Sequence, residues 1–495
     1  MQRAAIIAVL ALAGLAVWSF ECAGGNNERN ESLEQIAENA VSDDANVSEP
    51  AIRKLRMQGP AGLQALLAAH DEMIRKRTAM QGLVIVSSAA KHEPDPDEHA
   101  WQRLRAALDQ VSGQRDCHAS RLFWYTDFDE AKAAAKREGK PILSLRLLGK
   151  LTDEYSCANS RFFRTTLYAN AEISKALGDR FILHWKSVRP VPKVTIDFGD
   201  GRKLERTLTG NSIHYVLDSD GRIVDAFPGL YGPKAFLREL ERAEQAAKQA
   251  MSMSPGKREC FLAEYHRDRA SAIEMVWQQD LKTLGITVAS VETPNAATAN
   301  TTISPEYAPI VAQPNPALVS GPSTPPPSAM TAGKAAIGKG FVEMPIIKSA
   351  ALSSDAALTQ ATTGDVWNRI AQLHFGDSQL DAASVALIRS QHPAAAKAAR
   401  LAISKMAVED PLVRMVRSFQ GSIGIDTVRN EYLFHRQIHQ WLAATATPEI
   451  DAFNDRVYAE LFLTPRSDPW LGLMPADTYT ALENNGVQQV SIDKR

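Results

Sequence analysis

The sequence predicts an α/β domain, a mixed sheet flanked by helices, with helical regions on its N-terminal and C-terminal sides. Apolar runs such as Ile142–Leu148 are typical of buried strands, and they alternate with apolar residues at helical spacing. A stretch rich in Pro, Thr, Ser and Ala, residues 288–339, separates this part from a helical C-terminal domain. The length of 495 residues gives room for two or three such units.

The chain opens with a targeting segment, residues 1–24. Arg3 precedes the apolar run Ala4–Phe20, which suits a signal peptide or a short membrane anchor. Small residues near Cys22 offer a cleavage site, and a lipid on Cys22 is a third alternative. All three alternatives export the rest of the chain. We therefore expect a bacterial envelope protein, periplasmic or anchored, that contacts the membrane only through this segment.

The region before the α/β domain is mostly helical. Residues 25–48 are polar and are expected to be disordered. Residues 49–115 are expected to be helical, because Pro60 suits the first position of a helix and Glu98–Val111 is amphipathic. The segment around Pro60 resembles one hairpin of a helical-repeat protein, but a single such unit does not predict a repeat array. The expected role of this region is to brace the domain that follows.

The elements of the α/β domain, residues 116–245, follow in order. A helix leads to Gly139, a natural helix stop, and the strand Ile142–Leu148 comes next. Ser160–Leu167 has a helical pattern, and Phe181–Lys186 has that of the following strand. The remaining predicted elements are strands at Lys193–Phe198, Ser212–Leu217 and Ile223–Ala226, a turn at Asp218–Gly221 and a final helix over Pro233–Ala243.

These elements and a few motifs carry a resemblance to a known family. Trp124–Ala131 leads through a helix to Lys140-Pro141, and Cys157-Ala158-Asn159-Ser160 follows the first strand. This order resembles exported members of the thioredoxin-like superfamily, with a CxxS motif in place of the family's CxxC. The resemblance implies a thioredoxin-like domain with Cys157 at the N-terminus of a helix that begins near Ser160.

The resemblance also implies roles for individual residues. Cys157 would be the catalytic nucleophile, and Ser160 would donate a hydrogen bond to its sulfur in place of a second, resolving cysteine. Ser212 stands where the family has a cis-proline that faces the sulfur and presents backbone to a substrate chain. A cis bond before serine costs several kcal/mol and is not expected. Ser212, Ala158 and Asn159 are the expected substrate-facing residues.

Export changes what the cysteines predict. Disulfides persist outside the cytosol, and the mature chain would keep an odd number of cysteines: Cys117, Cys157 and Cys260. One disulfide with one free thiol is the simplest state, and the pairing is left open. Cys117 and Cys260 are thus additional candidate thiols. His118 could assist a thiolate at Cys117, although an incidental cysteine is the commoner case.

The sequence of the C-terminal half predicts helices on both sides of a linker. A charged helical extension is expected over residues 246–287, and residues 288–339 are expected to form an extended linker. Residues 340–495 are expected to be a helical domain, because apolar stripes recur there at helical spacing, as in Val413, Val416 and Phe419. Trp470 is expected to anchor a proline-containing segment over these helices.

The histidines and the overall charge give weaker signals. Glu431, His435 and His439 share one helix face, but no HExxH motif or partner ligand accompanies them. A polar helix face is therefore expected, and no metal or cofactor is predicted. His184 and His214 are expected to be hydrogen-bonded structural residues. The net charge of −2 gives no basis for nucleic-acid binding.

Two functions compete. In the first, Cys157 forms transient mixed disulfides with protein or small thiols, and an external thiol resolves them. In the second, the chain keeps the fold without the catalysis and serves as a scaffold or binding protein with a partner in the envelope. The substitution at Ser212 and the lengthened loop Gly149–Glu154 both depart from the family pattern. Exposure of the Cys157 sulfur would favour the first function, and its burial the second.

Overall fold

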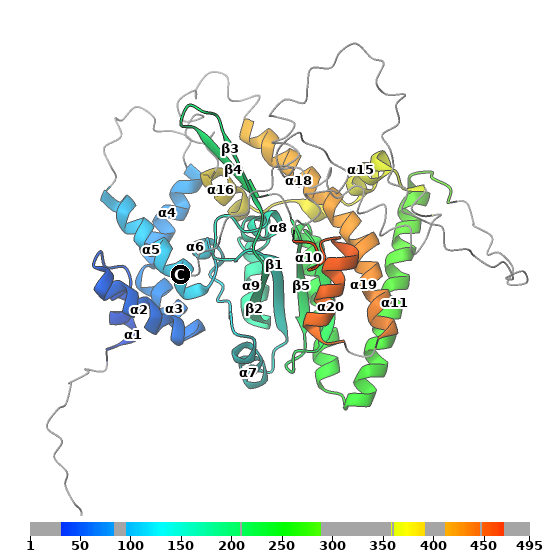
Figure 1. Cartoon of the computed structure of the whole chain (residues 1–495), viewed down its shortest axis with the longest axis horizontal. Coiled ribbons are helices and arrows are strands. Elements are labelled where there is room, and N and C mark those ends of the chain that lie inside the picture. Colours follow the sequence, from blue (N-terminus) through cyan, green and yellow to red (C-terminus); the bar gives the residue numbers. More distant parts are fainter. Residues whose placement is uncertain are drawn as a thin grey trace, which may run out of the picture.

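The computed structural model (Figure 1) describes most of the chain between the two ends. Three predicted features lie outside the described residues: the targeting segment 1–24, the linker after Val288, and Trp470. Within the described residues, no helix is both long enough and apolar enough to cross a membrane. The described residues are 31–83, 96–207, 210–288, 358, 361–391, 411–445 and 448–469.

The N-terminal helices pack on one another around a small apolar core. The expected disorder over residues 25–48 is wrong from residue 33 on. Ser32 caps the first helix by accepting a hydrogen bond from the Gln35 amide, and Ile36 and Ala37 are buried in this core. The helices are α1 (Leu33–Asn39), α2 (Ala45–Met57), α3 (Pro60–Ala69), α4 (Asp71–Leu83), α5 (Pro96–Ser112) and α6 (Cys117–Ser120).

A four-stranded mixed sheet forms the centre of the molecule, as predicted. Its order is β2-β1-β5-β6, with β1 parallel to β2 and the other pairs antiparallel. Every residue of β1, β5 and β6 is buried, which fits their mostly apolar sequences, and Arg146, His214 and Asp225 are buried with them. The strands are β1 (Ile142–Leu148), β2 (Ile182–Arg189), β5 (Ser212–Leu217) and β6 (Ile223–Pro228).

Helices flank the sheet, and one hairpin stands apart from it. Asp127 caps α7, and Gly139 ends it with a φ of 64°, as its place after the helical pattern predicts. The predicted strand at Lys193–Phe198 is present but pairs only with its own hairpin partner. These elements are α7 (Phe128–Glu138), α8 (Ala158–Phe162), the π-helical η1 (Phe163–Leu167), α9 (Ala171–Arg180), β3 (Lys193–Asp197), β4 (Lys203–Thr207) and α10 (Pro233–Met251).

Most of the C-terminal helices lie along α10 and α11 and against the sheet, whereas α16 (Ala382–Gln391) lies beside α4 and η1 (Figure 1). Two π-helical segments, η4 and η5, each continue a preceding helix. The elements are α11 (Pro255–Thr283), α15 (Gly364–Leu373), η3 (Phe375–Ser378), α16 (Ala382–Gln391), α18 (Pro411–Arg429), η4 (Asn430–His435), α19 (Arg436–Ala444), α20 (Ile450–Arg456) and η5 (Val457–Leu461).

These C-terminal helices do not bury their apolar faces in a core of their own within the described residues. Phe434 and Ile438 belong to the same buried cluster as the sheet. Trp367 of α15 stacks on Trp277 of α11, with ring centroids 5.6 Å apart. The prediction of a C-terminal unit separate from the α/β domain is therefore wrong here. An apolar stripe shows that a helix face must be covered, but not which segment covers it.

Candidate functional site

Cys157 occupies the predicted place at a helix N-terminus. It is the N-cap residue of α8, just after the loop that follows β1. Its backbone N–H donates to the Leu148 carbonyl at 3.1 Å, which ties the lengthened loop back to the end of the strand. The side chain has no exposed surface. The sulfur is therefore closed to any other molecule in this conformation.

The sulfur lies within hydrogen-bonding distance of groups in the first turn of α8 and at the start of β5. Its Sγ lies 2.8 Å from Ser212 Oγ, 3.4 Å from Ser160 Oγ and 3.7 Å from the Asn211 carbonyl oxygen. The Ser160 hydroxyl donates instead to the Cys157 carbonyl at 2.8 Å. The expectation that Ser160 donates to the sulfur is thus wrong, because its hydrogen serves the first turn of the helix.

Ser212 stands opposite the sulfur, as the resemblance implies. It is the first residue of β5, and the described residues contain no cis peptide bond. Ser212 and Asn159 are both buried, whereas Ala158 is partly exposed. The Asn159 side chain has no hydrogen-bond partner among the described residues. In this conformation, Ser212 and Asn159 face protein rather than a substrate.

The C-terminal segment covers this site. Tyr458 of η5 donates its hydroxyl to the Asn211 carbonyl at 3.1 Å, and the Asn211 side-chain amide donates to Thr464 Oγ1 at 3.1 Å. Arg189, at the end of β2, donates to the Thr464 carbonyl at 2.8 Å. The loop before β5 is therefore already bonded to residues of its own chain.

The two strand histidines are structural, as expected. His214 Nε2 lies 2.7 Å from the Tyr168 hydroxyl, and His184 Nδ1 lies 2.8 Å from Ser144 Oγ. Burial lowers the pKa of each imidazole to about 3, so both are neutral at ordinary pH. Neither contacts the Cys157 sulfur.

The described cysteines are all free, which contradicts the expected disulfide. Cys117 is buried among the N-terminal helices, and Cys260 is exposed on α11. Burial raises the pKa of the Cys117 thiol well above its ordinary value, and burial also lowers the pKa of His118 to about 4. His118 cannot act as a cation beside that thiol, so Cys117 is a packing residue.

A second group of polar side chains lies far from Cys157 in sequence, between β6, α11 and the C-terminal helices. Asp225 Oδ1 lies 2.9 Å from His435 Nε2, and Asp225 Oδ2 accepts from the Tyr265 hydroxyl at 2.5 Å. His435 Nδ1 lies 2.8 Å from Glu431 Oε2. The expected partly exposed polar face at residues 431, 435 and 439 is wrong, because both histidines are fully buried.

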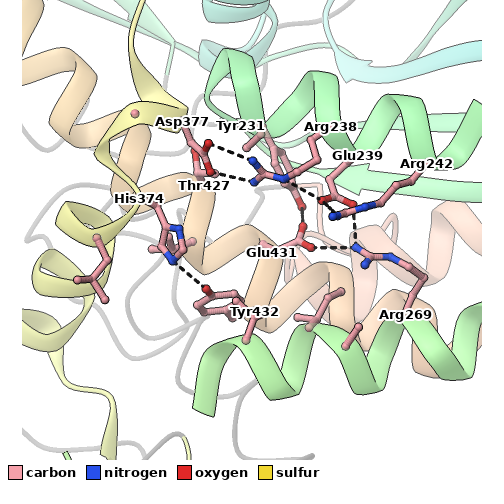
Figure 2. Close-up of a pocket in the computed structure, with 17 residues that line it drawn as sticks. Tyr231, Arg238, Glu239, Arg242, Arg269, His374, Asp377, Thr427, Glu431 and Tyr432 are labelled. Atoms are coloured by element: carbon pink, nitrogen blue, oxygen red, sulfur yellow. Dashed lines mark hydrogen bonds and ion pairs between the residues drawn. The ribbon is translucent and has the colours of Figure 1, made fainter. Parts of the chain in front are cut away.

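This group borders a pocket of about 520 Å³ between α10, α11, α15 and η4 (Figure 2). Arg238 binds Asp377 through two nitrogens, at 2.8 and 3.1 Å. Arg269 donates to Glu239 at 2.7 Å and to Glu431 at 3.4 Å, and Arg242 pairs with Glu239. Cationic and anionic side chains alternate along this wall.

Two pKa shifts set the charge of the pocket. Burial, followed by repulsion from Glu431, raises the pKa of Glu239 to about 7, which favours its neutral form. A hydrogen bond to Asp280 raises the pKa of His374, which favours its cationic form. The guanidinium groups are therefore not fully balanced by carboxylates.

The sequence placed Glu431, His435 and His439 on one helix face but did not indicate their partners or the pocket. Asp225 and His266 are distant from His435 and His439 along the chain, and only the fold brings them together. The helical spacing of the two histidines was the one visible signal. Comparison with protein-family models, with curated proteins and with solved structures finds no match.

Proposed function

We propose that the protein is a thioredoxin-fold scaffold or binding protein of the bacterial cell envelope, rather than a thiol–disulfide oxidoreductase. The observation that carries this proposal is the complete burial of Cys157 beneath its own C-terminal segment. A thiolate must reach a disulfide to attack it, and access is a condition of exchange. Without a second cysteine in the motif, no resolving thiol lies next to the sulfur either.

The sheet supports the thioredoxin-like part of the proposal. β1 and β2 are parallel, β5 and β6 continue the sheet in antiparallel pairs, and α10 follows. Cys157 lies between β1 and the helix after it, and Ser212 faces it from the start of β5. This arrangement is the one that the resemblance implies. The hairpin β3–β4 is an addition between β2 and β5.

The covering segment supports the loss of catalysis. In the family, backbone at the place of Ser212 is presented to a substrate chain. Here the Tyr458 hydroxyl already donates a hydrogen bond to the carbonyl of the preceding residue, Asn211. A substrate would have to displace a buried tyrosine and the Asn211–Thr464 hydrogen bond. The chain's own C-terminal segment thus takes the place of a substrate.

Alkylation of the native full-length chain tests this proposal. With a maleimide, followed by mass mapping of the modified peptides, we expect rapid modification of Cys260 and slow modification of Cys157 and Cys117. All three should react at similar rates in denaturant. A Cys157→Ser variant identifies the Cys157 signal. Modification of Cys157 in the native chain as fast as that of Cys260 would restore the thiol-exchange function.

The pocket of Figure 2 is the place where we propose that the protein binds a small anionic molecule. Arg242 and Arg238 are each nearly half exposed there, although each pairs with a carboxylate. Because the pKa of Glu239 is raised, an incoming carboxylate can compete with it as a partner of Arg242. The pocket volume suits a molecule of a few carboxyl groups.

Thermal unfolding with succinate or citrate tests this site. Either probe should raise the Tm of the wild-type chain, because a ligand of the native state stabilises it. The shift should vanish in Arg242→Ala. It should persist in the control Arg267→Ala, which removes an exposed arginine of α11 outside the pocket. An equal shift in all three chains would show an effect of ionic strength and would exclude the site.

A further inference from the structure

The four side chains that meet behind the pocket come from three separate segments. Asp225 lies on β6, His266 on α11, His435 at the end of η4, and His439 one turn later on α19. Each is at most 2% exposed. Buried polar groups are ordinarily satisfied by hydrogen bonds, ion pairs or metal ions. Three imidazoles and a carboxylate in one buried place therefore need an explanation.

Three donor atoms converge on one point. Asp225 Oδ1 lies 2.9 Å from His435 Nε2 and 3.7 Å from His439 Nε2, and all three atoms lie within 4.8 Å of one another. Ligands of a tetrahedral zinc ion with bonds of about 2.0–2.1 Å are about 3.3 Å apart. The two separations from Asp225 Oδ1 fall on either side of that value, each within about half an ångström of it.

The outer contacts of these donors fit metal ligands. His435 Nδ1 lies 2.8 Å from Glu431 Oε2, which is the carboxylate–histidine arrangement found behind many metal-binding imidazoles. His439 Nδ1 lies 2.9 Å from His266 Nδ1, so its second nitrogen also has a partner. The Tyr265 hydroxyl holds the other oxygen of Asp225. Every converging donor is thus oriented from behind.

One of the three converging donor atoms has no hydrogen-bond partner among the described residues. His439 Nε2 is buried and has no hydrogen-bond partner among the described residues, although it is directed to the Asp225 side. Such an atom costs free energy unless something binds it. His435 is the last residue of the π-helical η4, and His439 lies one turn later; π-helical segments are common at functional sites.

We propose that Asp225, His435 and His439 bind a divalent first-row metal ion, with zinc the best match to two imidazoles and one carboxylate. Three protein ligands leave one coordination position open. The site joins β6 of the sheet to η4 and α19, so the ion would fasten these C-terminal helices to the α/β domain. The neighbouring set Glu239, Glu431 and His435 is less suitable, because Arg269 already donates to both of its carboxylates.

Metal titration of the full-length, tag-free chain tests the proposal. Cys22 and Cys260 are replaced by serine in every chain, to remove thiols that could bind metal elsewhere. After treatment with a chelator, Co²⁺ should bind with one equivalent and give the intense visible absorption of four-coordinate cobalt. One equivalent of Zn²⁺ should remove that absorption and raise the Tm. Failure of the chain to bind one equivalent, or a weak six-coordinate spectrum, would overturn the proposal.

Variants locate the ion. His439→Gln should abolish stoichiometric binding, and Glu431→Gln, behind His435, should weaken it by about 10- to 100-fold. The control His99→Gln removes an exposed histidine of α5 and should bind as the parent chain does. Undiminished binding by folded His439→Gln would place the ion elsewhere and overturn the assignment. If His439→Gln does not fold, the cobalt spectrum of the parent chain together with Glu431→Gln decides.

Discussion

Tyr458→Ala should increase the rate of Cys157 alkylation in the native chain by about a hundredfold or more. Tyr458 is fully buried and donates its hydroxyl to Asn211, next to the residue that faces the sulfur. Removing a buried aromatic side chain costs about 3–5 kcal/mol, and each 1.4 kcal/mol changes an opening equilibrium about tenfold. The substitution should weaken mainly the packing of the segment Tyr458–Thr464 that covers the site, so local opening of this segment should expose the thiol. Mass mapping of modified peptides gives the rate.

Two variants show whether this opening is local. Tyr458→Phe keeps the ring and loses one hydrogen bond, worth about 1 kcal/mol, so its rate should rise only about fivefold. Tyr432→Ala removes another buried tyrosine, which stacks on Trp277 away from Cys157. It should leave the Cys157 rate unchanged. Equal acceleration by Tyr458→Ala and Tyr432→Ala would show global unfolding and would remove the support for a covering segment.

Gly232→Ala should lower the free energy of unfolding by about 3 kcal/mol. Gly232 is the N-cap of α10, and a Cβ there would lie 2.2 Å from the Asp377 carbonyl oxygen of η3. Its φ is −65°, which any residue adopts, so the expected cost is steric. Backbone cannot move aside as a flexible side chain can. Denaturation by urea, compared through the midpoints, measures the change.

Gly256→Ala is the matched control. Gly256 lies in the first turn of α11, and a Cβ there would meet nothing within 4 Å. Alanine in place of glycine in a helix should stabilise the chain by up to about 1 kcal/mol. If Gly232→Ala were as stable as the wild type, η3 would not pack on α10, and the shared core of the α/β domain and the C-terminal helices would be in doubt.

The sequence predicted the parts of the fold that local pattern controls. Ile142–Leu148 and Ser212–Leu217 are strands with the expected bounds, and Gly139 ends a helix. A mostly apolar run fits a strand buried on both faces, and glycine adopts a positive φ without strain. The place of Cys157 at a helix N-terminus is what the resemblance to the thioredoxin-like superfamily implied.

The predictions that were wrong concern features that depend on contacts between segments distant in the sequence. The helix α1 buries only Ile36 and Ala37, too few apolar residues to stand out from a polar stretch. The burial of His435 and His439 depends on Asp225, which is 210 residues from His435 in the chain. Likewise, no local pattern shows that Tyr458 covers Asn211. Side-chain spacing predicts which face of a helix or strand is apolar, but it does not predict which distant segment packs against that face.

We propose that Cys157 does not exchange disulfides because residues of its own chain cover it. Capture of disulfide-linked partners in native cells tests it most directly, with the wild type, Cys157→Ala and Cys260→Ala compared after acid quenching and thiol blocking. We expect the wild type and Cys157→Ala to give the same adducts, with adducts through the three described cysteines lost in Cys260→Ala, because only Cys260 is exposed among them. Adducts that are present in the wild type and lost in Cys157→Ala would show that Cys157 does exchange disulfides.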